Sequence, residues 1–536
     1  MASLCAGNAR GDVRMPAIFG DHMVLQQDVK LSVWGTADPG EQVSIAIGSS
    51  KGKATADATG KWTAKLPPLP VSATPVEMQV AGKNKLAFKD VLVGDVWLCS
   101  GQSNMEFGIG NTANAKELIP QMDYPSIRLF LVPHTLAFEP QTDIKQENLK
   151  GQWVVCTPQN VVAIGGWNGF SAVGLLFGRE IHEQRKQPVG LIGSYWGGTK
   201  VETWSSQEMF KATPELAHFV GDFETIKTGH SDILRKYTEE TLAKWQQDHD
   251  AWKQLVSQPL PQGTQRPKEP QRPESPDAYP QYPSVLYNGM INPLVSYGIK
   301  GVIWYQGESN GGKGEKAGEY QKTFASMIAD WRQRWGIGEF PFLFVQCPTW
   351  DFGYFWIRIR DEQFHTLAVP KTGMAVSIDV GEAKEVHPKG NKPTIAHRLA
   401  LAARRVAYGE KIVASGPLYS SFTVEGNKIR IHFTETGSGL MIGSAPSIRP
   451  NEQPKAPEDH LNGFEISPNT YQYFPAQALI DGDTIVVWSD SVATPKNVRF
   501  GAAGFPNPPL NLYNKEGLPA SPFNTITGAP ALPAAH

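Results

Sequence analysis

The sequence has few cysteines, and those it has lie far apart. Its 536 residues include four, with no Cys-x-x-Cys pair among them: Cys5, Cys99, Cys156 and Cys347. Structural zinc sites use closely spaced cysteine pairs, so we expect no zinc site, no other metal and no cofactor. Cys99 and Cys347 fall in apolar, strand-like runs, which predicts buried thiols. The spacing does not predict a disulfide between any two of them.

Long apolar runs and an excess of charge are also missing. No run approaches the ~18–20 apolar residues that a helix needs to cross a bilayer, so we expect no membrane partner. The 50 lysines and arginines nearly balance the 52 aspartates and glutamates, for a net charge of −2. That balance gives no reason to expect nucleic acid as a partner. Residues 1–14 show no apolar core with a cleavage site, so no signal peptide is visible.

The chain is rich in tryptophan, with 15, and in glycine and proline, with 52 and 42. The flat apolar face of a tryptophan suits stacking on a sugar ring, although most tryptophans pack cores and brace loops. We expect at least one of five tryptophans beside the ends of predicted strands to line a sugar pocket. These five are Trp167, Trp196, Trp204, Trp350 and Trp356.

The length predicts about three domains, at ~100–200 residues each. Short runs divided by turn signals over residues 13–93 predict a small antiparallel β-sandwich. Residues 94–415 predict a central α/β domain, interrupted at 206–283 by a charged helical stretch and a proline-rich strap. Short strands over 416–497 predict a second β-sandwich of a carbohydrate-binding kind. Residues 498–536 are irregular in pattern, and we expect them to pack back on the central domain.

Within the central domain, apolar strand candidates alternate with helix candidates. This alternation predicts a parallel sheet with helices on both faces. The strand candidates are 91–98, 127–132, 189–194, 301–305, 342–346 and 374–378, and the helix candidates are 171–187, 320–335 and 394–408.

The end of the first of these strands is the most informative part of the chain. The apolar run stops at Leu98 and is followed by Gly101-Gln-Ser-Asn-Met105. A serine between a strand and a helix is well placed to be a nucleophile, because the first free N–H groups of the helix can stabilise an oxyanion. The pattern is not Gly-x-Ser-x-Gly, since Asn104 and Met105 follow Ser103. The alternative is a serine that only caps the helix.

Candidates for the other parts of a serine hydrolase follow later strands. Gly197 and Gly198 could bring a backbone N–H close to a substrate carbonyl, since glycine has no side chain in the way. Gln306 or Asn310 could donate a side-chain N–H to the oxyanion. His387 lies in a polar loop before the last helix and could be the base. The carboxyl ends of parallel strands form the ligand-binding edge of an open α/β sheet, so we expect these residues to meet there.

These segments resemble the signature blocks of one family, the sialate O-acetylesterase-like branch of the SGNH (GDSL-type) hydrolases. The resemblance covers most of residues 15–525 and includes Phe19-Gly-Asp-His-Met-Val-Leu-Gln-Gln27, outside the four blocks. It implies an α/β fold: a three-layer SGNH-type (flavodoxin-like) parallel-sheet catalytic domain with accessory β-sandwich domains. The blocks are Gly101-Gln-Ser-Asn-Met105, Trp196-Gly-Gly-Thr199, Trp304-Tyr-Gln-Gly-Glu-Ser-Asn310 and Val386-His-Pro388.

The resemblance also implies a metal-free esterase that removes acetyl groups from sugars through an acyl-enzyme. Ser103 matches the nucleophile and His387 the base. The oxyanion positions match Gly198, or Gly197, and Gln306, or its neighbour Asn310. The residues expected to contact the substrate are Asn104, Trp204, Glu308 and Asn310.

One position departs from the superfamily pattern. SGNH enzymes commonly have aspartate three residues before the histidine, where this chain has Lys384. Glu385 is the nearest acid, but residues two apart on an extended chain point to opposite sides, so it reaches His387 only if the loop turns. We predict Glu385 as the third member, with Asp379 and a Ser-His dyad as alternatives.

The expected substrate is an acetylated carbohydrate. Xyloglucan, xylan and O-acetylated sialic acid all fit the motifs, and the accessory β-domains favour a plant cell-wall polysaccharide or oligosaccharide. Such a substrate predicts a secreted or periplasmic enzyme. The alternative function is a non-catalytic carbohydrate-binding protein with a degenerate esterase core, to which the missing aspartate and the tryptophans point. The sequence makes no prediction about oligomeric state.

Overall fold

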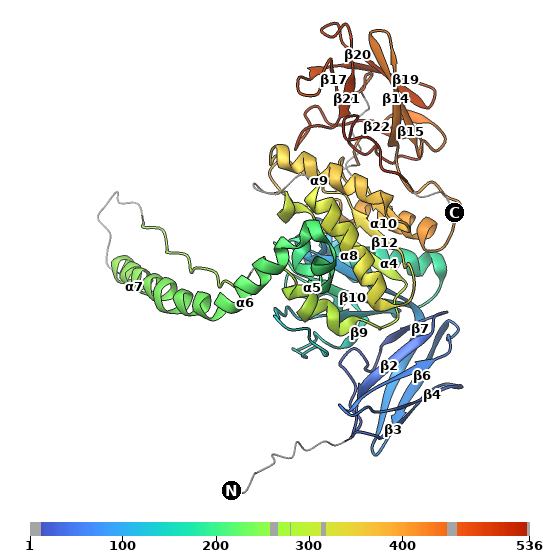
Figure 1. Ribbon diagram of the computed structural model, residues 1–536, viewed down its shortest axis with the longest axis vertical. Coiled ribbons are helices and arrows are strands. Elements are labelled where there is room, and N and C mark those ends of the chain that lie inside the picture. The colour runs from blue at the N-terminus through green and yellow to red at the C-terminus, as the bar shows by residue number, and fades with distance from the viewer. Residues whose placement is uncertain (1–11, 258–265, 279, 312–317, 447–457, 533–536) are drawn as a thin grey trace.

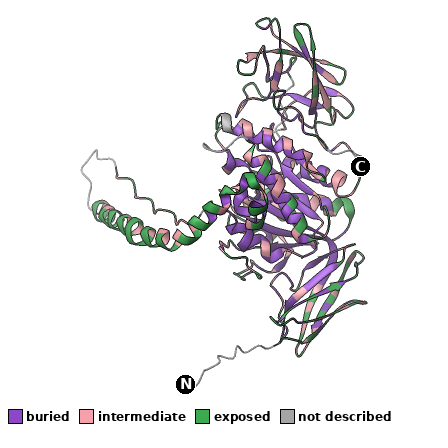
Figure 2. Ribbon diagram, in the orientation of Figure 1, coloured by how far each residue is buried: buried purple, intermediate pink, exposed green. Residues whose placement is uncertain are grey.

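The computed structural model describes residues 12–257, 266–278, 280–311, 318–446 and 458–532, and only the backbone of residues 354 and 355. Three units follow one another along its long axis: an N-terminal β unit, a central α/β unit and a C-terminal β unit (Figure 1). Buried residues concentrate in the central unit (Figure 2). Within the described residues, no helix is long and apolar enough to span a membrane.

The central unit is built on a sheet in which the parallel strand β7 lies between β10 and β11. The strand order is β13-β12-β11-β7-β10-β8-β9, parallel from β13 to β8, with β9 antiparallel at the edge. The chain passes from β7 to β8 and β10 on one side, then across β7 to β11, so the direction switches at β7, where open α/β sheets bind ligands. The strands are β7 (Lys85–Gly101), β8 (Tyr124–Leu131), β9 (Trp153–Cys156), β10 (Val189–Tyr195), β11 (Gly301–Tyr305), β12 (Phe342–Val345) and β13 (Thr372–Ala375).

Successive side chains on the central strands enter two different cores. Trp97 and Ile303 pack in one core with helices α4 and α10, whereas their neighbours Leu98 and Trp304 pack in the other with α8. Neighbouring residues on a strand point to opposite faces, so both faces of the sheet are covered. The helices are α1 (Ser103–Glu106), α2 (Ala115–Leu118), α3 (Pro158–Ala163), α4 (Ala172–Arg185), α5 (Gln207–Ala212), α6 (His218–Lys236), α7 (Ala243–Ser257), α8 (Glu319–Trp335), α9 (Tyr354–His365) and α10 (Lys392–Val406).

The N-terminal β unit shares a strand with the central unit. β7 pairs with β6 and β1 in its first part and with β10 and β11 in its second, so one strand of 17 residues runs through both units. β2 and β5 form a separate two-stranded sheet. The remaining strands are β1 (Val24–Gln26), β2 (Leu31–Thr36), β3 (Gln42–Ile47), β4 (Ser50–Thr55), β5 (Lys61–Leu66) and β6 (Ser72–Ala81).

The C-terminal β unit contains two four-stranded sheets, β14-β15-β20-β19 and β18-β17-β21-β23, and a small pair, β16-β22. The expected irregular pattern after residue 498 is wrong in part, because buried Val498, Phe500, Leu512 and Phe523 form short strands there. The strands are β14 (Leu418–Glu425), β15 (Lys428–Thr434), β16 (Leu440–Ile442), β17 (Phe464–Ser467), β18 (Phe474–Pro475), β19 (Gln477–Asp481), β20 (Thr484–Trp488), β21 (Asn497–Phe500), β22 (Leu512–Asn514) and β23 (Phe523–Asn524).

Helices α6 and α7 form an arm that projects from the central unit (Figure 1). The π-helical segment η5 (Tyr237–Leu242) joins them. The proline-rich strap returns along this arm, where Trp245 Nε1 donates to the carbonyl of Pro270 at 3.1 Å and Trp252 Nε1 donates to that of Pro267 at 3.0 Å. Residues 258–265 and 279 of the strap lie outside the described residues.

The predicted α/β class is confirmed, whereas the flavodoxin-like strand order is not. All six predicted central strands and all three predicted helices are present, with ends shifted by a few residues. Counted from β7, the parallel strands lie in the order 2-3-1-4-5-6, because β10 inserts between β7 and β8; the flavodoxin order is 2-1-3-4-5. Cys99, Cys156 and Cys347 are buried free thiols, and Cys5 lies outside the described residues.

Candidate active site

Three predicted site segments follow three adjacent strands of the central sheet. Ser103 follows β7, Gly197 follows β10 and Gln306 follows β11. The strand ends are locked together, since Gln102 N–H donates to the carbonyl of Tyr305 at 2.9 Å and Trp196 N–H donates to that of Gly101 at 3.1 Å. The sheet therefore brings these three blocks to its carboxyl edge, as predicted.

Ser103 is half-buried at the first position of helix α1. Gly197 lies directly beside it, so that a Cβ added to this glycine would sit 3.3 Å from Ser103 Cβ. The N–H of Gly197 is already bonded to Glu106 Oε2 at 2.6 Å. The N–H groups of Ser103 and Gly198 have no hydrogen-bond partner among the described residues. Of the two candidate glycines, Gly198 is therefore the one with a donor to spare.

His387 and Glu385 form a hydrogen-bonded pair. Glu385 Oε1 lies 3.1 Å from His387 Nδ1 and also accepts the backbone N–H of His387 at 3.1 Å. The loop thus makes the turn that Glu385 needs in order to reach the imidazole. His387 Nε2 is buried and has no hydrogen-bond partner among the described residues, which leaves it able to take a proton. Asp379 instead binds Arg398 with both oxygens, at 2.6 and 2.7 Å.

The surroundings of this pair shift its two pKa values. Burial lowers the pKa of His387 below its usual value, and the nearby positive charge of Lys392 lowers it further, against the raising effect of Glu385. Burial alone would raise the pKa of Glu385, but hydrogen bonds from Lys389 and His387 outweigh it and leave that pKa below its usual value. The histidine is thus kept neutral and the glutamate ionised near neutral pH, as a base and its orienting group require.

Asn104 links the serine block to the histidine loop. Its Nδ2 donates to the carbonyl of Val386 at 3.0 Å and to Glu308 Oε1 at 2.7 Å. Lys392 Nζ, at the start of α10, donates to Asn104 Oδ1 at 2.5 Å. Asn104, Glu308 and Lys392 are all buried. These three contacts hold Asn104 in place, and its predicted contact with the substrate stays a prediction.

Glu308 and Lys392 share one buried environment. Burial raises the pKa of Glu308, and it lowers the pKa of Lys392 to about 7, against the opposing attraction of Glu308 and Glu385. Glu308 is thus buried against Asn104, the residue after Ser103, and its predicted contact with the substrate stays a prediction.

Gln306 and Asn310 are also occupied. Gln306 Nε2 donates to the Thr199 carbonyl at 3.2 Å and to Asn310 Oδ1 at 2.7 Å, and Asn310 Nδ2 donates to Glu202 Oε2 at 3.0 Å. Both side chains are buried. Their amides brace the loop after β10 against the loop after β11, and their predicted oxyanion and substrate roles stay predictions.

The five tryptophans divide into buried and accessible ones. Trp204 and Trp356 are fully buried, and the Trp204 indole N–H donates to Thr199 Oγ1, so the structure gives no support to the predicted sugar contact at Trp204. Trp167 is 36% exposed and its ring meets that of His387 edge to face, with centroids 5.2 Å apart. Trp196 and Trp350 are half-buried.

Two features of the site were missed in the sequence. One is Lys392, whose signal is a lysine in the first turn of a helix, where the helix dipole disfavours a positive charge. The other is the pair of Glu106 and His134, with Glu106 Oε1 3.1 Å from His134 Nε2 and the His134 ring stacked on Trp196 at 4.1 Å. No sequence pattern links residues 106 and 134, which the sheet brings together.

Comparison with known proteins finds one family. A family model described as carbohydrate esterase, sialic acid-specific acetylesterase, matches residues 93–222 and 277–404. The chain is 32% identical over 445 residues to sialate O-acetylesterase of Mus musculus, covering 76% of this chain and 75% of the relative. It is 30% identical over 460 residues to the Homo sapiens enzyme of that name, covering 78% of this chain and 76% of the relative.

A solved structure is similar over nearly the whole length. It is that of a carbohydrate acetylesterase from Xanthomonas citri, with a TM-score of 0.75 and 32% identity, covering 96% of this chain and 99% of the other.

Proposed function

This chain belongs to the sialic acid-specific acetylesterase family of carbohydrate esterases, and from that premise we propose that Ser103, His387 and Glu385 carry out its reaction. The family makes it a carboxylic ester hydrolase that acts on acetylated carbohydrate. The proposal concerns which residues do this, how, and on which sugar.

The observation that carries the proposal is the bond from Asn104 to Val386. Asn104 follows the nucleophile, Val386 precedes the base, and the 3.0 Å bond between them fixes the two blocks together across 282 residues of chain. A degenerate core would have no need of this link or of the Glu385–His387 pair. The geometry therefore favours a working esterase over the non-catalytic binding protein.

In the acylation step, His387 Nε2 takes the proton of Ser103 Oγ as this oxygen attacks the acetyl carbonyl. The oxyanion of the tetrahedral intermediate is stabilised by the N–H groups of Ser103 and Gly198. The C–O bond to the sugar then breaks, the imidazolium gives its proton to the sugar oxygen, and acetyl-Ser103 remains. Glu385 holds Nδ1–H and stabilises the imidazolium that forms on the way.

In the second step, water attacks the acetyl-serine. His387 Nε2 takes a proton from the water, and the same two N–H groups stabilise the oxyanion. The bond to Ser103 Oγ breaks, the imidazolium returns its proton to this oxygen, and acetate leaves. Because each step begins with a neutral imidazole, the lowered pKa of His387 favours both.

We take the substrate to be an acetylated plant cell-wall polysaccharide or its oligosaccharides. Glu106 accepts the N–H of Gly197 and Glu385 pairs with His387, whereas Lys389 and Lys392 are each engaged by groups of the protein itself, at 2.9 and 2.5 Å. Both of these lysines are already paired within the described residues, which favours a neutral sugar over an anionic sialic acid. Trp167, beside His387, offers an exposed ring for such a sugar. A polymer of this size stays outside the cell, so we keep the prediction of a secreted or periplasmic enzyme.

The test is acetate release from three substrates offered at equal acetyl concentration: acetylated xyloglucan, acetylated xylan and O-acetylated sialic acid. We expect the highest kcat/KM on one of the two plant polymers. A preference for the sialic acid would contradict the substrate assignment and leave the mechanism standing. Absence of turnover on all three and on 4-nitrophenyl acetate would favour the binding protein.

A further inference from the structure

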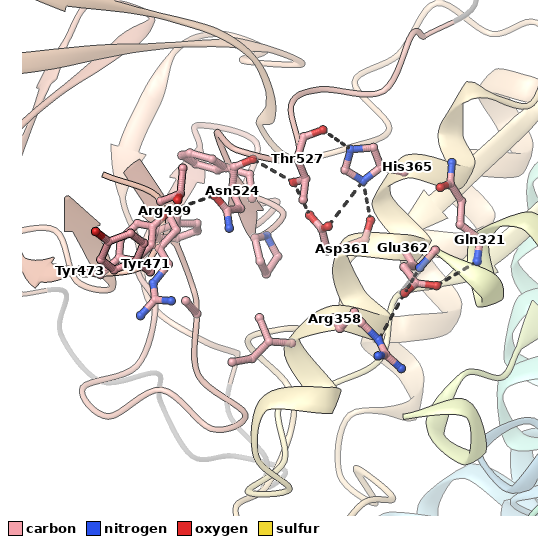
Figure 3. A pocket seen from close by; sticks show the side chains of 17 residues that line it. Gln321, Arg358, Asp361, Glu362, His365, Tyr471, Tyr473, Arg499, Asn524 and Thr527 are labelled. Atoms are coloured by element: carbon pink, nitrogen blue, oxygen red, sulfur yellow. Dashed lines mark hydrogen bonds and ion pairs between the residues drawn. The ribbon is translucent and has the colours of Figure 1, made fainter. Parts of the chain in front are cut away.

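A cleft of about 560 Å³ lies where the central unit meets the C-terminal β unit (Figure 3). One wall is the outer side of α9, and the other consists of residues 470–473 and the end of β21. Residues 522–527 cross between the walls. We call this space the junction cleft. It is separate from Ser103, and no step of the mechanism uses it.

An exposed aromatic ring marks one wall of the junction cleft. Tyr471 is 84% exposed, more than any other large apolar or aromatic side chain of the described residues. Its loop is held in place, because Asn469 Oδ1 accepts the N–H groups of Tyr471 and Gln472 at 3.0 and 2.8 Å. The nearby Tyr473 ring is covered on one face by the Arg499 guanidinium at 4.0 Å. An exposed ring on a fixed backbone is a ready platform for a ligand with an apolar face.

The opposite wall carries polar side chains on α9. Asp361, Glu362 and His365 face the cleft in Figure 3, with Arg358 beside them. Arg358 lies 3.3 Å from Glu362, Arg499 lies 2.8 Å from Glu465, and Asp361 lies 3.8 Å from His365. A lining of paired charges and polar side chains suits a neutral ligand rich in hydroxyl groups.

The two walls are tied rigidly together. The buried guanidinium of Arg360 on α9 donates to the carbonyls of Ala503 and Gly504, at 3.1 and 2.6 Å. Thr527 Oγ1 donates to Asp361 Oδ1 at 3.1 Å. The cleft is thus preformed, and a ligand would not have to order it on binding.

We propose that the junction cleft is a second, non-catalytic binding site for a neutral polysaccharide chain, with Tyr471 as its stacking platform. The class of sugar in this proposal rests on the proposed function, whereas the evidence for a binding cleft does not. Helix α9 also supports the active site, because Gln363 Nε2 donates to the carbonyl of Gln306 at 3.0 Å. A chain held in the cleft is therefore anchored to the same helix that braces the catalytic loops, which keeps a polymer near Ser103 between turnovers.

The test is affinity gel electrophoresis of the full chain in xyloglucan or xylan from which the acetyl groups have been removed. These probes contain no ester, so binding is measured without the reaction. We expect Tyr471→Ala to raise the apparent Kd about three- to tenfold, by loss of one aromatic stacking contact, and Tyr471→Phe to bind like the wild type. Leu479→Ala is the matched control, because Leu479 is 60% exposed in the same unit but outside the cleft.

All three variants should hydrolyse 4-nitrophenyl acetate at the wild-type rate, which separates this site from the catalytic one. The proposal is overturned if the wild type binds neither polymer, or if Tyr471→Ala binds as tightly as the wild type. Binding of an anionic sialyl-oligosaccharide in preference to both polymers would also overturn it. A wild type without esterase activity whose polymer binding still depends on Tyr471 would refute the proposed function alone.

Discussion

At the scale of single residues, the site depends on which acid holds the histidine. Glu385 meets Nδ1 of His387, whereas Asp379 is committed to a buried pair with Arg398 and also accepts a hydrogen bond from Tyr513 at 3.1 Å. The sequence left Glu385 and Asp379 both as candidates for the third member. The structure gives them different contacts, so substitutions of the two should have different effects.

We expect Glu385→Gln to lower kcat/KM by roughly 10²- to 10⁴-fold with little change in thermal stability, by analogy with a triad aspartate. Asp379→Asn should instead destabilise the fold by about 3 kcal/mol, since it leaves the buried Arg398 without its counter-charge. Its activity at low temperature should stay near that of the wild type. Kinetics with 4-nitrophenyl acetate and thermal unfolding of both variants make the comparison. The opposite pattern would move the orienting role to Asp379.

A second residue-scale prediction concerns Lys392 and pH. The active imidazole is neutral, so kcat/KM rises with pH through the pKa of His387, which lies below its usual value. Burial lowers the pKa of Lys392 to about 7, so it is charged at the lower pH of this acid limb and depresses the pKa of His387 there. Lys392→Met should therefore move the acid limb to higher pH.

The matched control is Lys392→Arg, which keeps the charge and should leave the acid limb in place even if it slows turnover. A Lys392→Met variant that loses activity or stability but keeps the wild-type acid limb would show that the lysine has only a packing role.

At the scale of elements, the sequence predicted what depends on local pattern. Residues 91–98 of β7 and the whole of β10 and β11 are buried, and the serine, glycine and glutamine blocks follow these strands as expected. The features that the sequence could not predict depend on contacts between residues far apart in the chain. The insertion of β10 between β7 and β8 and the 2.5 Å contact of Lys392 with Asn104, 288 residues away, leave no periodic signal. The burial of Trp204 is of the same kind.

The close contact between β7 and β11 beneath the serine gives an element-scale prediction. Gly101 has φ +133°, and a Cβ there would lie 2.2 Å from the carbonyl oxygen of Tyr305. Gly101→Ala should cost about 2 kcal/mol or more of stability and displace Ser103, because backbone strain adds to a clash with backbone. Gly20→Ala, which meets nothing within 4 Å, is the control and should be neutral. Equal melting temperatures for the two variants would contradict this account of the strand ends.

At the scale of the whole molecule, three units are joined by shared elements. β7 runs from the N-terminal unit into the central sheet, and Arg360 fixes the C-terminal unit to α9. The serine thus sits in a body continuous with two accessory β units.

One prediction at this scale concerns metals. The proposed mechanism stabilises the oxyanion with backbone N–H groups and needs no Lewis acid. Exhaustive treatment with EDTA should therefore leave kcat/KM for 4-nitrophenyl acetate unchanged. A loss of activity that zinc or another divalent ion restores would replace the serine mechanism by metal-assisted hydrolysis.

The central claim is that the Ser103 hydroxyl is the nucleophile, and its most direct test is the turnover of Ser103→Ala. The side chain is half-buried and makes no hydrogen bond with the described residues, so the variant should keep the wild-type circular dichroism and melting temperature. Its kcat for 4-nitrophenyl acetate should fall by about 10⁴- to 10⁶-fold, as on loss of a triad nucleophile. A folded variant that retains more than about a tenth of the wild-type kcat would contradict the assignment of Ser103 and the mechanism built on it.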